Sequence, residues 1–116
     1  MLVGQKLRPH WGATVIDAFE AMEGNGPLTG TMLDHRIAVA STDYLAADRV
    51  MLEAMDVKPD TVGHLVYCAQ ASLGQYDLSK IDVCGEKIAD VRKPYRMPAE
   101  LESILEWMHA LGDQIR

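Results

Sequence analysis

The chain has 116 residues, enough for one domain that buries roughly two-thirds of the surface of its unfolded form. Hydrophobic residues make up 48% of it, and the formal charge is -6, from 17 acidic and 11 basic side chains. An acidic surface repels phosphate backbones, so we expect no nucleic-acid partner. No apolar run approaches the ~18 residues that span a bilayer, and the N-terminus lacks the long apolar region of a signal peptide. We therefore expect no membrane contact and a cytoplasmic location.

The chain has two cysteines, Cys68 and Cys84, which are 16 positions apart. Two cysteines cannot hold an iron–sulfur cluster alone, and no pair has the C-x-x-C spacing of redox and metal motifs. We expect two buried, apolar thiols and no cofactor held by this chain.

In chain order, residues 1–12 form a lead-in in which Pro9 and Gly12 break any periodicity. Residues 13–16 are apolar and end in β-branched side chains, which predicts a short buried strand. Residues 17–22 fit either one helical turn or extended chain. Three glycines and a proline in residues 24–30 predict a loop, and the apolar residues 37–40 predict a second strand.

Two helices are predicted next. Thr42 or Asp43 caps the first, which runs to about Met55, because their side-chain oxygens accept hydrogen bonds from the first turn. Asp60 or Thr61 caps the second, which runs to about residue 73.

Residues 81–85 predict a third strand. Pro98 then begins an amphipathic helix over residues 98–112. Its apolar stripe consists of Leu101, Ile104, Leu105, Met108 and Leu111.

This order of elements predicts an α/β domain, with a small layered sheet of about three strands and helices packed on it. We expect one domain over residues 1–116. It consists of the lead-in 1–12, a core over 13–92 and the C-terminal amphipathic helix 98–112.

Two motifs carry a family resemblance. Residues 16–27 contain Glu-Gly-Asn-Gly-Pro, and residues 40–48 contain Ser-Thr-Asp followed by a second aspartate at Asp48. At this spacing they resemble the family called domain of unknown function 362. Residues 81–86 are similar to a strand and Gly-Glu that follow two helices in that family. The resemblance covers roughly residues 11–90 and implies the fold and a possible redox setting, but no established catalytic residue.

Two departures from the family accompany the resemblance. Family members carry a substantial portion ahead of the Glu-Gly-Asn-Gly-Pro loop, whereas about 20 residues precede it here, so the chain resembles the C-terminal part of the family domain. Many relatives also carry ferredoxin-like cysteine motifs for four-iron clusters, and this chain has none. An iron–sulfur cluster is thus implied by association only, without its ligands here.

The candidate ligand-binding residues come from these two motifs. They are Glu23, Gly24, Asn25, Gly26, Ser41, Thr42, Asp43 and Asp48. The glycines can present backbone N–H groups to an anion, and a helix N-terminus can do the same. Tight turns and helix caps explain the same residues without a ligand. Because open parallel sheets bind ligands at the carboxyl ends of their strands, we expect Asn25, Gly26 and Ser41 to lie close together there.

Three of these side chains raise further possibilities. Glu23, Asp43 and Asp48 together could bind a hard cation through oxygen ligands. Because Asp48 has apolar helical neighbours, we expect it to be largely buried and hydrogen-bonded. The four scattered histidines suggest no zinc site.

Two functional classes remain open. The chain is either a ligand-binding domain, for which the resemblance implies a place in a redox-associated protein, or a structural or protein-interaction domain without a catalytic site. Whether it is an enzyme is undecided. A sheet of three short strands leaves edges and apolar faces that need cover. We therefore expect a homodimer or a complex with another subunit, through the helix 98–112 or a sheet edge.

Overall fold

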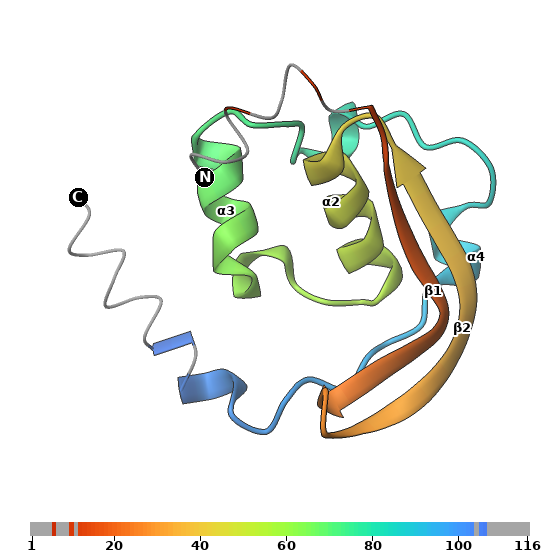
Figure 1. Ribbon diagram of the computed structural model, residues 1–116, viewed down its shortest axis with the longest axis vertical. Coiled ribbons are helices and arrows are strands. Elements are labelled where there is room, and N and C mark those ends of the chain that lie inside the picture. Colours follow the sequence, from red (N-terminus) through yellow and green to blue (C-terminus); the bar gives the residue numbers. More distant parts are fainter. Residues whose placement is uncertain (1–5, 7–9, 11, 104, 107–116) are drawn as a thin grey trace.

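The fold is built on a long antiparallel hairpin of two strands. The structure, a computed structural model, describes residues 6, 10, 12–103, 105 and 106. Strand β1 (Thr14–Asn25) pairs with strand β2 (Thr29–Ser41), so that Thr14 lies opposite Ser41 and Asn25 opposite Thr29. Helix α2 covers one face of this hairpin (Figure 1). The prediction of an α/β domain is confirmed.

Both strands are longer than the sequence predicts. Residues 17–22 are extended chain, and each of them except Phe19 has a partner in β2. Cross-strand pairing therefore decides a segment whose local preference is ambiguous. The glycine-rich loop shrinks to a turn over residues 26–28.

The hairpin bends sharply near its middle. The register shifts between Ala18 and Glu20, and Arg36 on the facing strand has a φ of 62°. On the exposed side of the bend, Arg36 Nε donates to the Asp34 carboxylate at 2.8 Å, and its guanidinium lies 5.8 Å from the centre of the Phe19 ring. An irregular pairing of this kind increases the local twist and bend of a sheet, and both strands curve round the helical layer in Figure 1.

Helix α2 (Tyr44–Ala54) follows β2 directly and begins at Asp43, as predicted. Helix α3 (Gly63–Gln70) is shorter than predicted, because a 3-10 turn, η2 (Pro59–Thr61), precedes it and Ser72 has a positive φ of 56°. The buried core lies between these two helices. Its central residues are Leu45, Leu52, Val57 and Leu65.

Two short helical elements follow, η3 (Leu78–Lys80) and α4 (Ile88–Val91). Residues 81–85, predicted as a third strand, lie between them and pair with no strand in the described part of the chain. The described sheet has two strands, so the prediction of about three is not confirmed. The strand-like pattern is present, but its backbone has no neighbouring strand at hydrogen-bonding distance.

Residues 91–99, which we call the return segment, tie the helical layer to the hairpin. Lys93 N–H donates to Ala54 O at 2.8 Å and Tyr95 N–H to Met55 O at 3.0 Å, both at the end of α2. Toward its C-terminal end, the return segment contacts the turn end of the hairpin, where Gly24 N–H donates to Arg96 O at 2.8 Å. One extended stretch thus contacts both layers of the fold.

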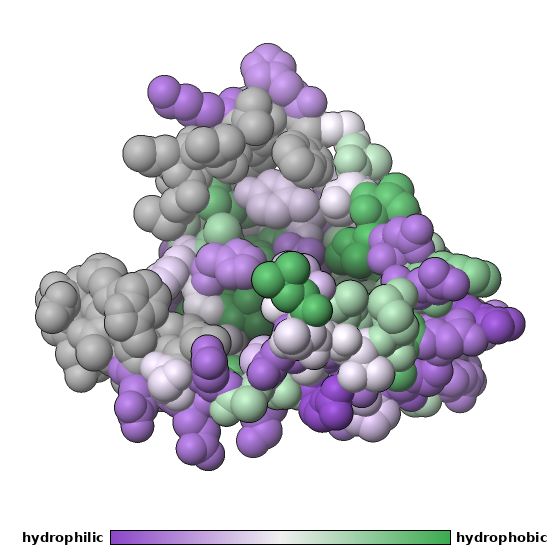
Figure 2. All heavy atoms as spheres, turned by 60° about the horizontal axis from the view of Figure 1, so that its bottom comes forward, coloured by the Kyte–Doolittle hydropathy of each residue, from purple (hydrophilic) through white to green (hydrophobic). Residues whose placement is uncertain are grey.

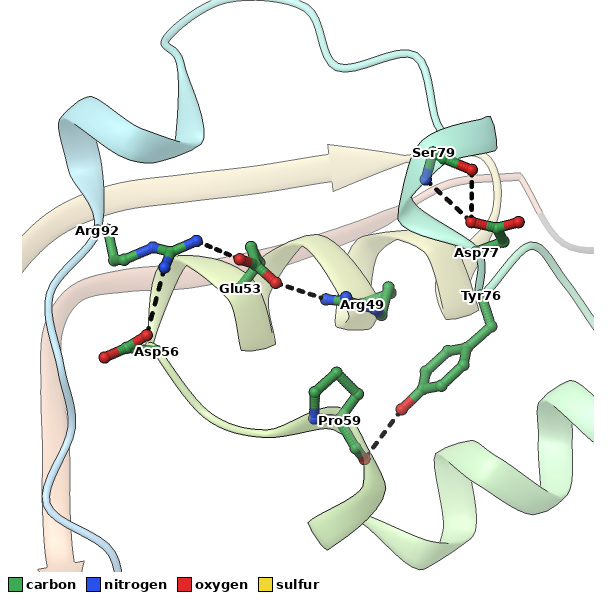
Figure 3. A network of polar contacts seen from close by, with 8 residues as sticks. All are labelled: Arg49, Glu53, Asp56, Pro59, Tyr76, Asp77, Ser79 and Arg92. Atoms are coloured by element: carbon green, nitrogen blue, oxygen red, sulfur yellow. Dashed lines mark hydrogen bonds and ion pairs between the residues drawn. The ribbon is translucent and has the colours of Figure 1, made fainter.

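Ion pairs strengthen the first of these contacts. Arg92 binds the Glu53 carboxylate on α2, and Arg92 Nη1 lies 3.4 Å from Asp56 Oδ1. Glu53 also accepts from Arg49 at 3.1 Å, one helical turn earlier. Figure 3 shows this chain of charges running from the return segment along α2.

The buried histidine His35 joins the bend of β2 to the return segment. It is 7% exposed; its Nε2 lies 2.7 Å from Val91 O and its Nδ1 lies 2.8 Å from the hydroxyl of Tyr95. A carbonyl oxygen can only accept, so Nε2 carries the proton and, in the neutral ring, Nδ1 accepts from Tyr95. Burial, with a smaller contribution from the Glu23 carboxylate, raises the pKa of Tyr95, which keeps its hydroxyl protonated.

The predicted helix 98–112 begins three residues later than expected, because Pro98 and residues 99–100 are not helical. Residues 101–103, 105 and 106 are helical, and residues 104 and 107–112 lie outside the described part. Among the described residues, no helix is long and apolar enough to cross a membrane.

The first prediction concerns His35. His35→Leu leaves the Val91 carbonyl and the Tyr95 hydroxyl without their partner, so unfolding free energy should fall by about 1–3 kcal/mol in urea titration. His64→Leu is the matched control, because His64 is exposed, and it should change stability by less than about 0.5 kcal/mol. Equal midpoints for the two variants would contradict the bridging role of His35.

Candidate functional site

The structure separates the two motifs from which a single site was expected. Asn25 and Gly26 lie at the turn end of the hairpin, and Ser41 lies at its open end, opposite Thr14. Eleven steps along a strand separate these ends, on the order of 35 Å along the chain. The expectation that Asn25, Gly26 and Ser41 lie together is therefore wrong. It assumed parallel strands, whereas this pair is antiparallel.

The polar side chains of the glycine motif bind the return segment. Glu23 Oε2 accepts from the backbone N–H of Arg96 at 2.8 Å, and Asn25 Oδ1 accepts from Ala99 N–H at 2.9 Å. The Arg96 guanidinium reaches Thr31 Oγ1 on β2 at 2.7 Å. The motif thus fixes the course of the chain some 70 residues later, counted from Glu23 to Arg96.

Gly24 is required by this contact. Its φ is +76°, and a Cβ there would lie 3.1 Å from the Arg96 guanidinium. A side chain would strain the backbone at this φ, and the Arg96 guanidinium would have to shift by a few tenths of an ångström. The glycine therefore serves close approach, as the motif suggests, but the approaching group belongs to the same chain.

Asp43 joins the start of α2 to the loop after α3. Its Oδ1 accepts from Leu45 N–H at 2.9 Å and Ala46 N–H at 3.1 Å, and its Oδ2 accepts from Gln75 N–H at 2.7 Å. A Cβ on Gly74 would lie 2.3 Å from Asp43 Oδ1, so only glycine fits beside the cap. Ser41 Oγ accepts from Asp43 N–H at 3.0 Å and completes the turn into the helix.

Asp48 is half-buried, and its carboxylate has no hydrogen bond within the described residues. The expectation that it is largely buried and hydrogen-bonded is therefore wrong, because the helix turns it toward a partly open side near His64. Burial raises the pKa of Asp48 above its ordinary value of 3.8, and the nearby His64 lowers it by less. The charged form is thus disfavoured in the folded chain.

The proposed cation ligands do not meet. Glu23 binds the return segment at the turn end, whereas Asp43 caps α2 next to the open end. Over the residues that the structure describes, no three His, Cys, Asp or Glu side chains are grouped as metal ligands would be.

A groove of about 640 Å³ runs beside β2, on the side away from β1. Strand β2 forms one wall, α2 the floor, and residues 81–86 with α4 the opposite wall. Figure 1 shows this opposite wall as the cyan chain beyond β2. Of the candidate site residues, Ser41 and Thr42 line the groove. Glu23, Gly24, Asn25, Gly26, Asp43 and Asp48 do not.

The backbone of β2 has a free edge along this groove. Within the described residues, 36–41 form backbone hydrogen bonds with no segment except β1. In an antiparallel pair, alternate residues direct their N–H and C=O groups away from the partner strand. The groove is therefore bordered by a row of unpaired donors and acceptors.

The side chains of the groove are mostly small or apolar. Ala46, Ala47, Val50 and Ala54 form the floor. Polar groups lie on the far wall, at Asp82, Cys84 and Glu86, and at one end, where Arg36 is already paired with Asp34. Cys84 is exposed and Cys68 is half-buried, so the expectation of two buried thiols is wrong.

Sequence reasoning missed this groove because it treated residues 81–85 as a paired strand. Two features of the sequence point to it. Residues 81–85 alternate apolar and polar side chains, and a sheet of few strands leaves an exposed edge. The pattern could not reveal that the pairing is missing.

A bent hairpin, covered on one face by α2 and bordered by a groove along β2, defines a small α/β domain. Residues 4–53 match the model of the domain of unknown function family DUF362, which confirms the resemblance over the N-terminal part of this chain. The match takes in the hairpin and nearly all of α2, and it ends before α3 and the far wall of the groove. No curated protein matches the chain, and no solved structure does.

The second prediction tests the structural role of Asp43. Asp43→Ala removes the cap and leaves Gln75 N–H without its acceptor, so unfolding free energy should fall by about 2 kcal/mol. Asp43→Asn keeps an acceptor oxygen and should recover part of the loss. Asp82→Ala, at an exposed position, should cost less than about 0.5 kcal/mol. Chemical denaturation that ranks Asp82→Ala with Asp43→Ala would refute the role.

The third prediction concerns Asp48 and pH. Its pKa is raised on folding, so the unfolded chain loses the proton first as pH increases, and the folded chain loses stability between pH 3.8 and the raised pKa. Asp48→Asn should therefore stabilise the protein at neutral pH, with no gain below pH 3.8. Asp60→Asn, at an exposed position, is the control. A stability gain that grows toward acidic pH would contradict the sign.

Proposed function

We propose that this chain is a binding domain and that its ligand site is the groove beside β2. The observation that carries the proposal is a concave space of about 640 Å³ bordered by an unpaired strand edge. Ligand pockets commonly measure about 300–1,000 Å³ and combine an apolar lining with a few polar groups. The alanine-rich floor and the polar residues of the far wall match this description.

The glycine loop and the helix cap are weaker candidates for the same role. The acceptor oxygens of Glu23, Asn25 and Asp43 already receive backbone N–H groups of this chain. A ligand at either place would have to displace those contacts, whereas a ligand in the groove would meet unpaired groups. Ser41 and Thr42 remain candidate ligand-binding residues, because they line one end of the groove.

A second candidate function, association with another copy or another subunit, is supported by a different surface. The hairpin face turned away from α2 exposes Val15 at 70%, Phe19 at 57% and Met32 at 58%. Figure 2, in which the turn end of the hairpin comes forward, shows apolar surface there among polar residues. Large exposed apolar patches mark association sites, and these side chains, which are spread along the hairpin, would contribute to one. The homodimer or partner complex stays a prediction.

The fourth prediction uses Cys84 as a reporter of the groove. In Cys68→Ser, Cys84 is the remaining thiol, and its reaction with N-ethylmaleimide can be followed by mass spectrometry. A panel of small molecules and a pool of random heptapeptides are the probes. At least one member should slow the labelling of Cys84 severalfold, because an occupied groove covers the thiol.

The control moves the thiol out of the groove. In Cys68→Ser/Cys84→Ser/Ser79→Cys, the thiol lies on η3, which does not line the groove. Its labelling should be unchanged by any probe that protects Cys84. No protection of Cys84, or equal protection at both positions, would refute the groove as the ligand site.

A further inference from the structure

We propose that the ligand of this groove is an extended polypeptide segment that adds to β2 as a third strand; this inference rests on the proposed function. The free edge of residues 36–41 presents donors and acceptors that alternate along the strand. An extended chain carries the complementary groups with the same repeat. Addition of a peptide strand to an exposed sheet edge is an established mode of recognition.

The closed far side of the groove favours a single strand over a second copy of the chain. Residues 81–86 face β2 across the groove and close its far side. In a second copy, β2 carries β1 at its other edge, so its insertion would bring two strands against this wall. A lone extended segment needs one strand spacing of about 4.8 Å from β2 and brings no second strand toward this wall.

The floor selects the side chains on one face of the segment. Ala46, Ala47 and Ala54 are small and lie at the bottom of the groove, beneath the space beside β2. Successive side chains of a strand point to opposite faces, so every second residue of the ligand would point toward this floor. Branched apolar side chains such as valine fill such a space and also favour the extended conformation.

The acidic side chains of the far wall favour a positively charged ligand. Asp82 and Glu86 are exposed on it, and the groove's one basic residue within the described chain, Arg36, is paired with Asp34. The whole chain has a formal charge of -6. The complementary ligand therefore alternates apolar residues with basic ones.

The test measures the binding of four synthetic peptides by fluorescence anisotropy. The first is a heptapeptide of alternating lysine and valine, and the second replaces every lysine with glutamate. Because the glutamate peptide places like charges together, it should bind more weakly by about tenfold or more. Reversal of the wall charge in Asp82→Lys/Glu86→Lys should invert this preference, while Asp17→Lys/Glu20→Lys, on the exposed β1, should leave it in place.

The third and fourth peptides test backbone pairing. N-methylation of alternate residues of the lysine–valine peptide, in each of the two possible sets, removes the donors of one edge at a time. Methylation in at least one set should weaken binding by about tenfold or more, because that edge faces β2. Hydrogen exchange should also slow at those amides of residues 37–41 that point away from β1 when the unmodified peptide binds. If neither methylated set binds more weakly than the parent, strand addition is refuted.

Failure of this inference differs from failure of the proposed function. If small molecules protect Cys84 but no peptide binds, the groove is a ligand site and its ligand is not a strand. If Cys84 becomes protected as protein concentration rises, and light scattering shows a dimer, the occupant is a second copy and the inference is overturned. If no probe protects Cys84, both proposals fail.

Discussion

The return segment is the constraint on which the rest of this structure depends. A two-stranded hairpin is marginally stable alone in water, and here residues 91–99 hold it against the helical layer. The segment binds the end of α2 through its backbone and Arg92, and it binds the turn end of the hairpin through Glu23 and Asn25. His35 secures the middle from within the hairpin. Contacts at three places along one extended stretch fix the angle between the two layers.

This arrangement explains why the most conspicuous motif of the sequence is not an open site. Gly24 lets the return segment approach, while Glu23 and Asn25 satisfy its backbone N–H groups. Buried or close-packed backbone donors need such partners. Along β2, the outer edge of the described sheet faces a groove instead of a strand. The polar groups that hold the return segment and the outer edge of β2 therefore lie in different places.

Much of the local structure could be predicted from the sequence. The cap at Asp43, the extent of α2 and the presence of strands on both sides of the glycine loop follow from side-chain oxygens, apolar runs and turn residues. These signals act over a few residues and need no knowledge of the distant chain. The same reasoning was wrong for the third strand at 81–85, because a segment becomes a strand only where a second backbone lies beside it.

The sequence by itself determined where α2 begins and ends, which residues turn the hairpin, and that the surface is acidic. The tertiary structure alone decided that the strands run antiparallel, which sends the glycine loop and Ser41 to opposite ends. It also decided that Glu23 meets Arg96 and that residues 81–86 face β2 across a groove. Caps and periodicity are properties of neighbouring residues. Strand direction, long-range hydrogen bonds and concave surfaces depend on how distant segments pack. Short-range patterns in the sequence do not reveal this packing.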